Sequence, residues 1–109
     1  QNWIGGNLKP RGSLHIDAGA SAALQAGKSL LPIGVTAIDG EFERGDCVAI
    51  IGPDGFDMAR GLTAYASASA ARIIGRQSSE IVSLLGYNGR SEMIHRDDLV
   101  MSQTTSNGK

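Results

Sequence analysis

The predicted fold is decided by the segment DGEFERGDCVAIIGPDG, residues 39–55. Its second half contains a continuous apolar run, residues 47–51, which has the length and composition of one buried strand. A turn signal lies on each side of that strand, Asp39-Gly40 before it and Pro53-Asp54-Gly55 after it. Two hairpin-like units in succession are therefore predicted, and they favour an antiparallel, partly closed sheet.

Further short strands are predicted on both sides of this segment. Apolar residues alternate or cluster there in runs of strand length, separated by turns that are rich in glycine and proline. These runs cover residues 14–16, 36–38, 58–66, 93–95 and 99–101. The predicted fold class is therefore mainly β, with short α-helices in the connections.

One helix is predicted directly after the first strand. Asp17 is a good N-cap, because its carboxylate can accept hydrogen bonds from the unpaired N–H groups of the first turn. The alanine-rich residues 18–26 follow it, and Gly27 can adopt the left-handed conformation that ends a helix.

Two later helices are predicted to begin at serine caps. One starts at Ser67 or Ser69 and runs to Ile74, and the other starts at Ser78 and covers residues 79–85. A glycine follows each of them and is predicted to end the helix.

The composition is that of one domain with an aliphatic core. The chain has 109 residues, which is too few for two independent cores, and 41% of them are hydrophobic. One Trp, two Tyr and two Phe are the whole aromatic content, so the core has to be built from aliphatic side chains. The 15 glycines fit short strands and tight turns better than a helical bundle.

The charge balance argues against a dedicated nucleic-acid binder. The formal net charge is −1, whereas tight binding to phosphate backbones normally requires an excess of Lys and Arg. Residues 39–57 contain six acids and one arginine, and residues 60–96 contain five arginines and two acids. A polarised surface and ordinary charged turns are both compatible with this pattern. With no signal peptide and no apolar run of membrane-spanning length, the chain is predicted to be cytoplasmic, without membrane contact.

Two short motifs resemble parts of nucleotide-binding and kinase motifs, but the residues around them do not fit those motifs. Gly27-Lys28-Ser29 copies the end of a phosphate-binding loop, but Ala22 stands where the first glycine is needed, and the motif follows a helix rather than a strand. His95-Arg96-Asp97 copies part of a protein-kinase catalytic loop, but the matching lysine and asparagine are absent.

No metal or catalytic constellation emerges from the remaining polar residues. His15, His95 and Cys47 show no ligand-type spacing, and Cys47, the only cysteine, is predicted to be a buried, inert thiol. The adjacent Asp97 and Asp98 do not suit paired acid–base work. The sequence therefore predicts no catalytic, cofactor-binding or metal residues in this chain.

Three stretches carry a family resemblance. They are residues 3–4 with 8–14, residues 17–32 with Gly-Lys-Ser-Leu-Leu-Pro at their end, and residues 94–100 with Ile-His-Arg-Asp at their start. Phe42-Glu43-Arg44-Gly45-Asp46 lies between them and fits the Phe-x-x-Gly-Asp pattern of PUA domains generally. Over residues 3–101 the chain is similar to the C-terminal PUA domain of bacterial glutamate 5-kinases.

The resemblance implies a PUA-like pseudo-barrel of mixed strands with short helices. It implies a parent enzyme that transfers the γ-phosphate of ATP to the side-chain carboxylate of L-glutamate with Mg²⁺, the first step of proline biosynthesis. The sites for these ligands belong to an N-terminal amino-acid-kinase domain in a cytoplasmic homo-oligomer. Residues 1–9 would be a remnant of that domain or a linker, residues 10–101 the PUA domain, and residues 102–109 a disordered tail.

Two functions are compatible with this resemblance. The preferred one is a regulatory and structural appendage that packs on the amino-acid-kinase domain or on neighbouring subunits, and the alternative is an RNA-binding module. Ile74 and Asp98 stand where a basic residue and Asn are expected, which makes the surface less basic and disfavours RNA. The predicted RNA or partner surface comprises Lys28, Arg72, Arg76 and Arg96.

Overall fold

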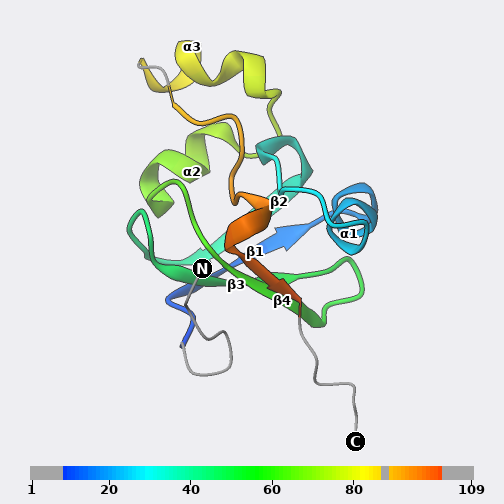
Figure 1. The fold of residues 1–109 in the computed structure, drawn as a ribbon. Coiled ribbons are helices and arrows are strands. Elements are labelled where there is room, and N and C mark those ends of the chain that lie inside the picture. Colours follow the sequence, from blue (N-terminus) through cyan, green and yellow to red (C-terminus); the bar gives the residue numbers. More distant parts are fainter. Residues whose placement is uncertain (1–8, 87–88, 102–109) are drawn as a thin grey trace, which may run out of the picture.

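Strand β3 (Cys47–Ile51) forms the centre of a five-stranded sheet in the computed structural model, which describes residues 9–86 and 89–101. The strand order is β2-β1-β3-β4-β5 (Figure 1). Residues 47–50 are all buried, as expected for a central strand that is covered on both faces. With three short helices, the sheet confirms the predicted mainly β class. The other strands are β1 (Gly12–Ile16), β2 (Val35–Gly40), β4 (Asp57–Leu62) and β5 (Leu99–Met101).

The first of the two predicted hairpins is wrong, because β2 does not pair with β3. Strand β1 lies between them, antiparallel to β2 and parallel to β3, so that Leu14 is opposite Ile38 on one side and Ile50 on the other. The turn signal is real, since Gly40 ends β2 with a φ of +83°. However, residues 41–46 form a loop long enough to pass the end of β1, whose buried Leu14 and Ile16 favour an inner position in the sheet.

The second predicted hairpin, β3–β4, is confirmed. Its turn is closed by the Gly52 N–H, which donates to the Phe56 carbonyl at 2.9 Å, and Gly55 has a φ of +87°. Strand β4 is shorter than predicted and ends at Leu62. At Thr63 the chain leaves the strand pairing, because the Thr63 hydroxyl donates to the carbonyl of Tyr65 at 2.8 Å and its N–H donates to Asp46.

Helix α1 (Ala18–Gln25) begins and ends as predicted. The Asp17 Oδ1 atom accepts a hydrogen bond of 2.8 Å from the N–H of Ala20. Gly27 has a φ of +84°, and the Lys28 N–H reaches back to the carbonyl of Ala23 at 3.0 Å. Both ends of the helix are therefore satisfied by local hydrogen bonds.

Replacing the cap is expected to weaken α1. Asp17→Ala should lower the free energy of unfolding by about 1 kcal/mol, because the N–H group of Ala20 loses its acceptor. Urea denaturation of the chain measures this change. Glu41→Ala is the matched control, since Glu41 is an exposed acid outside any helix. Equal stability losses in the two variants would contradict the capping role of Asp17.

The two later helices form, but not with the predicted caps. Ala66, not Ser67 or Ser69, is the N-cap residue of α2 (Ser67–Ile73). The Ser67 hydroxyl instead accepts from the N–H of Phe42 at 3.3 Å, because the loop before β3 packs there. Residues 78–85 form a 3₁₀ turn, η3 (Ser78–Glu80), followed by α3 (Ile81–Leu85). Gln77 is the N-cap residue of η3, and the Ser78 hydroxyl, inside that turn, donates to the carbonyl of Ser91 at 2.8 Å.

The strand predicted over residues 93–95 is reduced to one isolated bridge. Ile94 pairs with Leu30, whose N–H donates to the Ile94 carbonyl at 3.0 Å. The chain then turns through the 3₁₀ helix η4 (Arg96–Asp98) before β5. A second 3₁₀ helix, η2 (Pro32–Gly34), leads into β2. Most of the predicted linker at residues 1–9 and all of the tail at residues 102–109 lie outside the described residues.

The core is aliphatic, as the composition predicts. Phe42 and Tyr65 are its buried aromatic residues among those described, and most of the other members are Leu, Ile and Val. Figure 1 shows α2 and α3 stacked above the sheet, with α1 beyond the end of β1. Cys47 is buried, as predicted. Burial raises the pKa of the Cys47 thiol, which therefore stays protonated at neutral pH.

Candidate functional site

A groove lies between α1 and the segment of residues 28–34. It has a volume of about 420 Å³. The N–H of Asp17 donates to the carbonyl of Gly34 at 3.0 Å, which ties the start of the helix to the end of that segment. Gly34 also allows the close approach of the two walls, because a Cβ atom at residue 34 would lie 2.5 Å from the Cβ atom of Ala20. The groove is thus built by contacts between its own walls.

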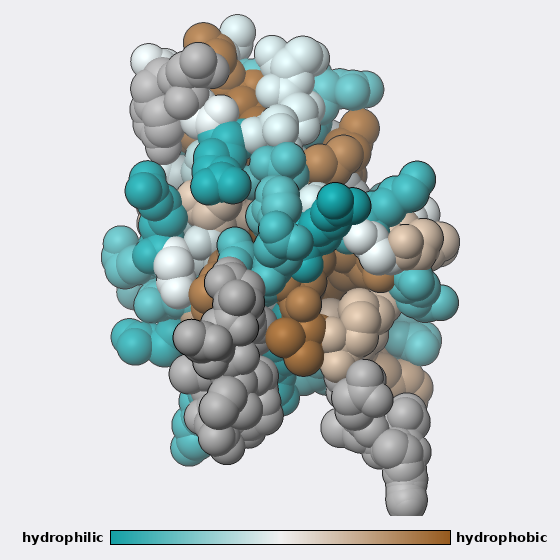
Figure 2. All heavy atoms as spheres, in the orientation of Figure 1, coloured by the Kyte–Doolittle hydropathy of each residue, from teal (hydrophilic) through white to brown (hydrophobic). Residues whose placement is uncertain are grey.

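The surface of the groove is mainly apolar. Leu31 and Ile33 are 43% and 44% exposed, and alanines of α1 form the opposite wall. Among its described lining residues Lys28 is the one cation, and it faces two acids, Asp17 and Glu92. Figure 2 shows a mostly hydrophilic exterior in which hydrophobic atoms emerge at separate places rather than as one continuous face. An apolar wall with a slightly negative charge balance suits a protein segment better than a phosphate backbone.

The four predicted surface cations come from separate segments of the fold. Lys28 and Arg96 come from segments that touch, because the Arg96 N–H donates to the hydroxyl of Ser29 at 2.9 Å. Arg72 lies exposed in the last turn of α2. Arg76 follows that helix, and its guanidinium pairs with Glu80 at 3.2 Å.

The acidic residues 39–57 serve local structure. The Asp46 carboxylate accepts from the N–H of Glu43 at 2.8 Å, and that of Asp54 accepts from the N–H of Phe56 at 3.2 Å. Asp57 pairs with Arg60 at 3.2 Å. These carboxylates therefore stabilise turns and a strand end. This supports the interpretation of residues 39–57 as ordinary charged turns and disfavours an acidic docking surface.

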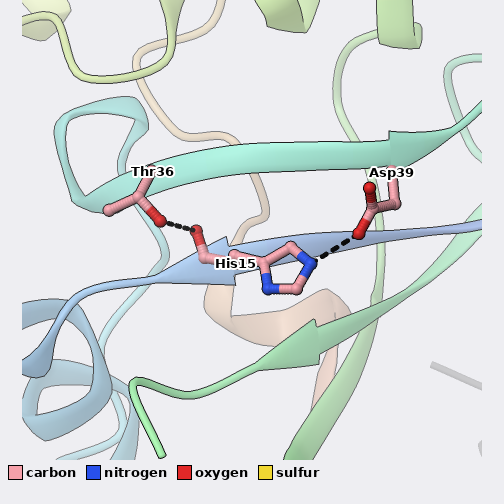
Figure 3. Close-up of polar contacts among 3 residues, drawn as sticks. All are labelled: His15, Thr36 and Asp39. Carbon is pink, nitrogen blue, oxygen red and sulfur yellow. Dashed lines mark hydrogen bonds and ion pairs between the residues drawn. The ribbon is translucent and has the colours of Figure 1, made fainter. Parts of the chain in front are cut away.

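The two histidines are also engaged locally. The His15 Nε2 atom lies 2.6 Å from the Asp39 carboxylate, which makes a diagonal pair between β1 and β2 (Figure 3). The Thr36 hydroxyl donates to the His15 carbonyl at 3.2 Å. The Nδ1 atom of His95 accepts from the N–H of Asp97 at 3.1 Å. Across residues 9–86 and 89–101, no three His, Cys, Asp or Glu side chains gather in a metal-binding arrangement.

Comparison with known proteins places this fold and groove in a family. The family model described as "PUA domain" matches residues 12–85, more than half of the chain. The chain belongs to the PUA domain family. This PUA domain is 63% identical over 101 residues to a glutamate 5-kinase of Nitrobacter winogradskyi, a match that covers 93% of the chain and 27% of that protein. It is 59% identical over 100 residues to a glutamate 5-kinase of Rhizobium etli, covering 92% of the chain and 26% of that protein.

The chain thus spans about a quarter of the length of the curated relatives it matches, and the match falls on their C-terminal part. Solved structures support the PUA fold at lower identity. A PUA domain from Aeropyrum pernix K1, solved as a tartrate complex, aligns with a TM-score of 0.60 and 24% identity, covering 79% of this chain and 41% of that one. A chain of the archaeal box H/ACA sRNP Nop10-Cbf5 complex aligns with a TM-score of 0.52 and 20% identity, covering 84% and 23%. No helix among the described residues is long and apolar enough to cross a membrane.

Sequence reasoning did not predict that Leu31 and Ile33 would be exposed. The run Leu30-Leu31-Pro32-Ile33 is uniformly apolar, which suggests complete burial. In the structure Leu30 and Pro32 are buried while Leu31 and Ile33 face outward. Leu31 has an extended backbone, with φ of −102° and ψ of 152°, so neighbouring side chains point to opposite sides there, and Pro32 then begins the 3₁₀ turn.

Proposed function

We propose that this PUA domain is the C-terminal accessory domain of a glutamate 5-kinase and that it regulates and stabilises the amino-acid-kinase domain. The observation that carries the proposal is the identity of about 60% to the C-terminal quarter of glutamate 5-kinases. In such an enzyme the γ-phosphate of ATP passes to the side-chain carboxylate of glutamate, giving glutamyl 5-phosphate and ADP. ATP and Mg²⁺ would bind to the kinase domain and not to this one.

The groove beside α1 is the proposed contact for the kinase domain. A protein surface that covers the exposed Leu31 and Ile33 gains free energy from burying them. Among the described residues of the groove, the phosphates of RNA would find only one lysine, beside two acids. The kinase domain is the proposed occupant, because the relatives extend for about two and a half times the length of this chain beyond the matched part. Packing in this groove would shift the kinase between conformations of different activity.

Ile33→Asp in the full-length enzyme tests this contact. We expect a changed KM for glutamate, Mg²⁺ requirement, proline inhibition or oligomeric state, because a carboxylate in the apolar groove opposes docking. Steady-state kinetics and sedimentation measure these properties. Val82→Asp is the matched control, since Val82 is 51% exposed on α3, away from the groove. Unchanged kinetics and assembly in Ile33→Asp would exclude the accessory role of this surface. Absence of glutamate phosphorylation in the unaltered enzyme would exclude the parent activity.

RNA binding is the second candidate, favoured by the contact between the segments of Lys28 and Arg96. Fluorescence anisotropy of the chain with single-stranded RNA of mixed sequence decides between the two functions. An accessory role predicts no signal even at low salt. A saturable signal that weakens steeply as salt rises, and that Lys28→Gln and Arg96→Gln both reduce, would establish RNA as the partner instead.

A further inference from the structure

A second hollow lies beside the segment of residues 63–66 and brings two arginines together. It has a larger lobe of about 340 Å³ and a smaller one of about 190 Å³, and Arg44, Ala64 and Arg90 line both. The two arginines are 46 positions apart in the chain. Neither has an ion pair or a side-chain hydrogen bond with any described residue, whereas Arg60 and Arg76 each pair with a carboxylate. The two arginines thus line the larger lobe, where no described residue supplies a counter-charge.

The position of Arg44 is fixed by its turn. The Gly45 N–H donates to the Thr63 carbonyl at 2.8 Å, and the Thr63 N–H returns a bond to Asp46 at 3.0 Å. The Asp46 carboxylate also closes the turn onto the N–H of Glu43. The turn that carries Arg44 is therefore held to the buried residue Thr63 through Gly45 and Asp46.

The position of Arg90 is fixed from the same segment. The hydroxyl of Tyr65, a residue only 4% exposed, donates to the carbonyl of Arg90. Gly89 packs so closely on the Tyr65 ring that any Cβ atom at residue 89 would overlap it. Both arginine-bearing segments are thus held through two buried residues, Thr63 and Tyr65, which makes their convergence a feature of the fold.

The charge and size of the hollow specify the class of ligand. Among the described residues, the larger lobe is lined by both arginines and no acid, and its other lining residues are small except for Tyr65. Ser69 contributes a hydroxyl that can donate a hydrogen bond. The smaller lobe adds His95 and Asp98, and Asp98 is itself engaged in an interaction. The Nδ1 atom of His95 accepts a backbone N–H, so the proton of the neutral ring resides on Nε2, which is a donor.

We propose that this hollow binds a phosphate group, either free phosphate or a small phosphate monoester. Two guanidinium groups match the charge of roughly −2 that a phosphate monoester carries at neutral pH, and each can form paired hydrogen bonds to its oxygens. A single carboxylate would leave one arginine without a counter-charge. The larger lobe is of the size of a small-molecule site. The site is distinct from the groove beside α1, with which it shares no lining residue.

Titration of the chain with inorganic phosphate, followed by NMR of the arginine side-chain and backbone amides, tests the proposal. We expect saturable shifts at Arg44, Arg90 and Ser69, and an affinity lowered about tenfold or more in Arg44→Gln and in Arg90→Gln. Arg44→Lys should retain part of the affinity, because it keeps the charge but loses the paired geometry. Arg72→Gln is the matched control and should bind as the unaltered chain does, since Arg72 is an exposed arginine outside the hollow.

Adenosine 5′-monophosphate, as a second probe, separates the two sources of phosphate. Tighter binding than inorganic phosphate at the same residues identifies an organic monoester, and equal or weaker binding identifies free phosphate; both outcomes support the site. Absence of saturable binding by either probe would overturn the proposal, as would an equal loss of affinity in Arg72→Gln. Binding of single-stranded RNA through Arg44 and Arg90 without binding of inorganic phosphate would also overturn it, in favour of a nucleic-acid surface.

Discussion

Ile50→Ala is expected to lower the free energy of unfolding by about 2–5 kcal/mol, because it opens a cavity at the centre of the sheet. Ile50 is fully buried in β3, the middle strand, where it is opposite Leu14 of β1 and Ala59 of β4. Both of these partners are fully buried as well. The two neighbouring strands hold the backbone in place, so the surroundings can relax only in part, and the loss should fall in the upper half of this range.

Urea denaturation followed by circular dichroism measures the effect. Val82→Ala is the control, because Val82 is 51% exposed on α3 and the same kind of truncation there should change the stability by about 0.5 kcal/mol or less. A typical domain has about 5–15 kcal/mol of stability in all, so Ile50→Ala should move the denaturation midpoint visibly. A loss below about 1 kcal/mol would contradict the central position of β3.

Local signals in the sequence predicted the elements whose hydrogen bonds are local. Asp17 and Gly27 mark the two ends of α1, because each acts on backbone groups within a few residues of itself. The β3–β4 hairpin is similar, since Pro53-Asp54-Gly55 and the two strands it joins are contiguous. The family resemblance supplied the fold class itself.

Features that depend on contacts between distant segments could not be predicted. The insertion of β1 between β2 and β3 follows from the burial of Leu14, which no turn signal reports. Ser78 is a good cap by composition, but its hydroxyl is used by Ser91. Arg44 and Arg90 meet only because Thr63 and Tyr65 hold their two segments. At Ser78 a tertiary contact outweighs a local capping preference of about 1 kcal/mol.

Gly34→Ala is expected to lower the free energy of unfolding by about 1–3 kcal/mol, because the added methyl group overpacks the contact between η2 and α1. A Cβ atom at residue 34 would lie 2.5 Å from the Cβ atom of Ala20, so one wall of the groove has to move. Gly19 lines the same groove, but Gly19→Ala should raise the free energy of unfolding. Its Cβ atom would meet only the Asp17 carboxylate at 3.5 Å, and alanine favours a helix over glycine by up to about 1 kcal/mol.

A double-mutant cycle with Ala20→Gly separates the clash from any other effect of Gly34→Ala. In the unaltered chain Ala20→Gly should cost about 1 kcal/mol, the helix propensity of alanine over glycine. In the Gly34→Ala background, Ala20→Gly removes the methyl group that clashes with residue 34, so it should be neutral or stabilising. The effects of the two substitutions on the free energy of unfolding should therefore not be additive. An equal cost of Ala20→Gly in both backgrounds would show that the groove walls do not touch at this point. Because the proposed kinase contact requires the walls in this spacing, Gly34→Ala should also reproduce the kinetic change of Ile33→Asp in the full-length enzyme.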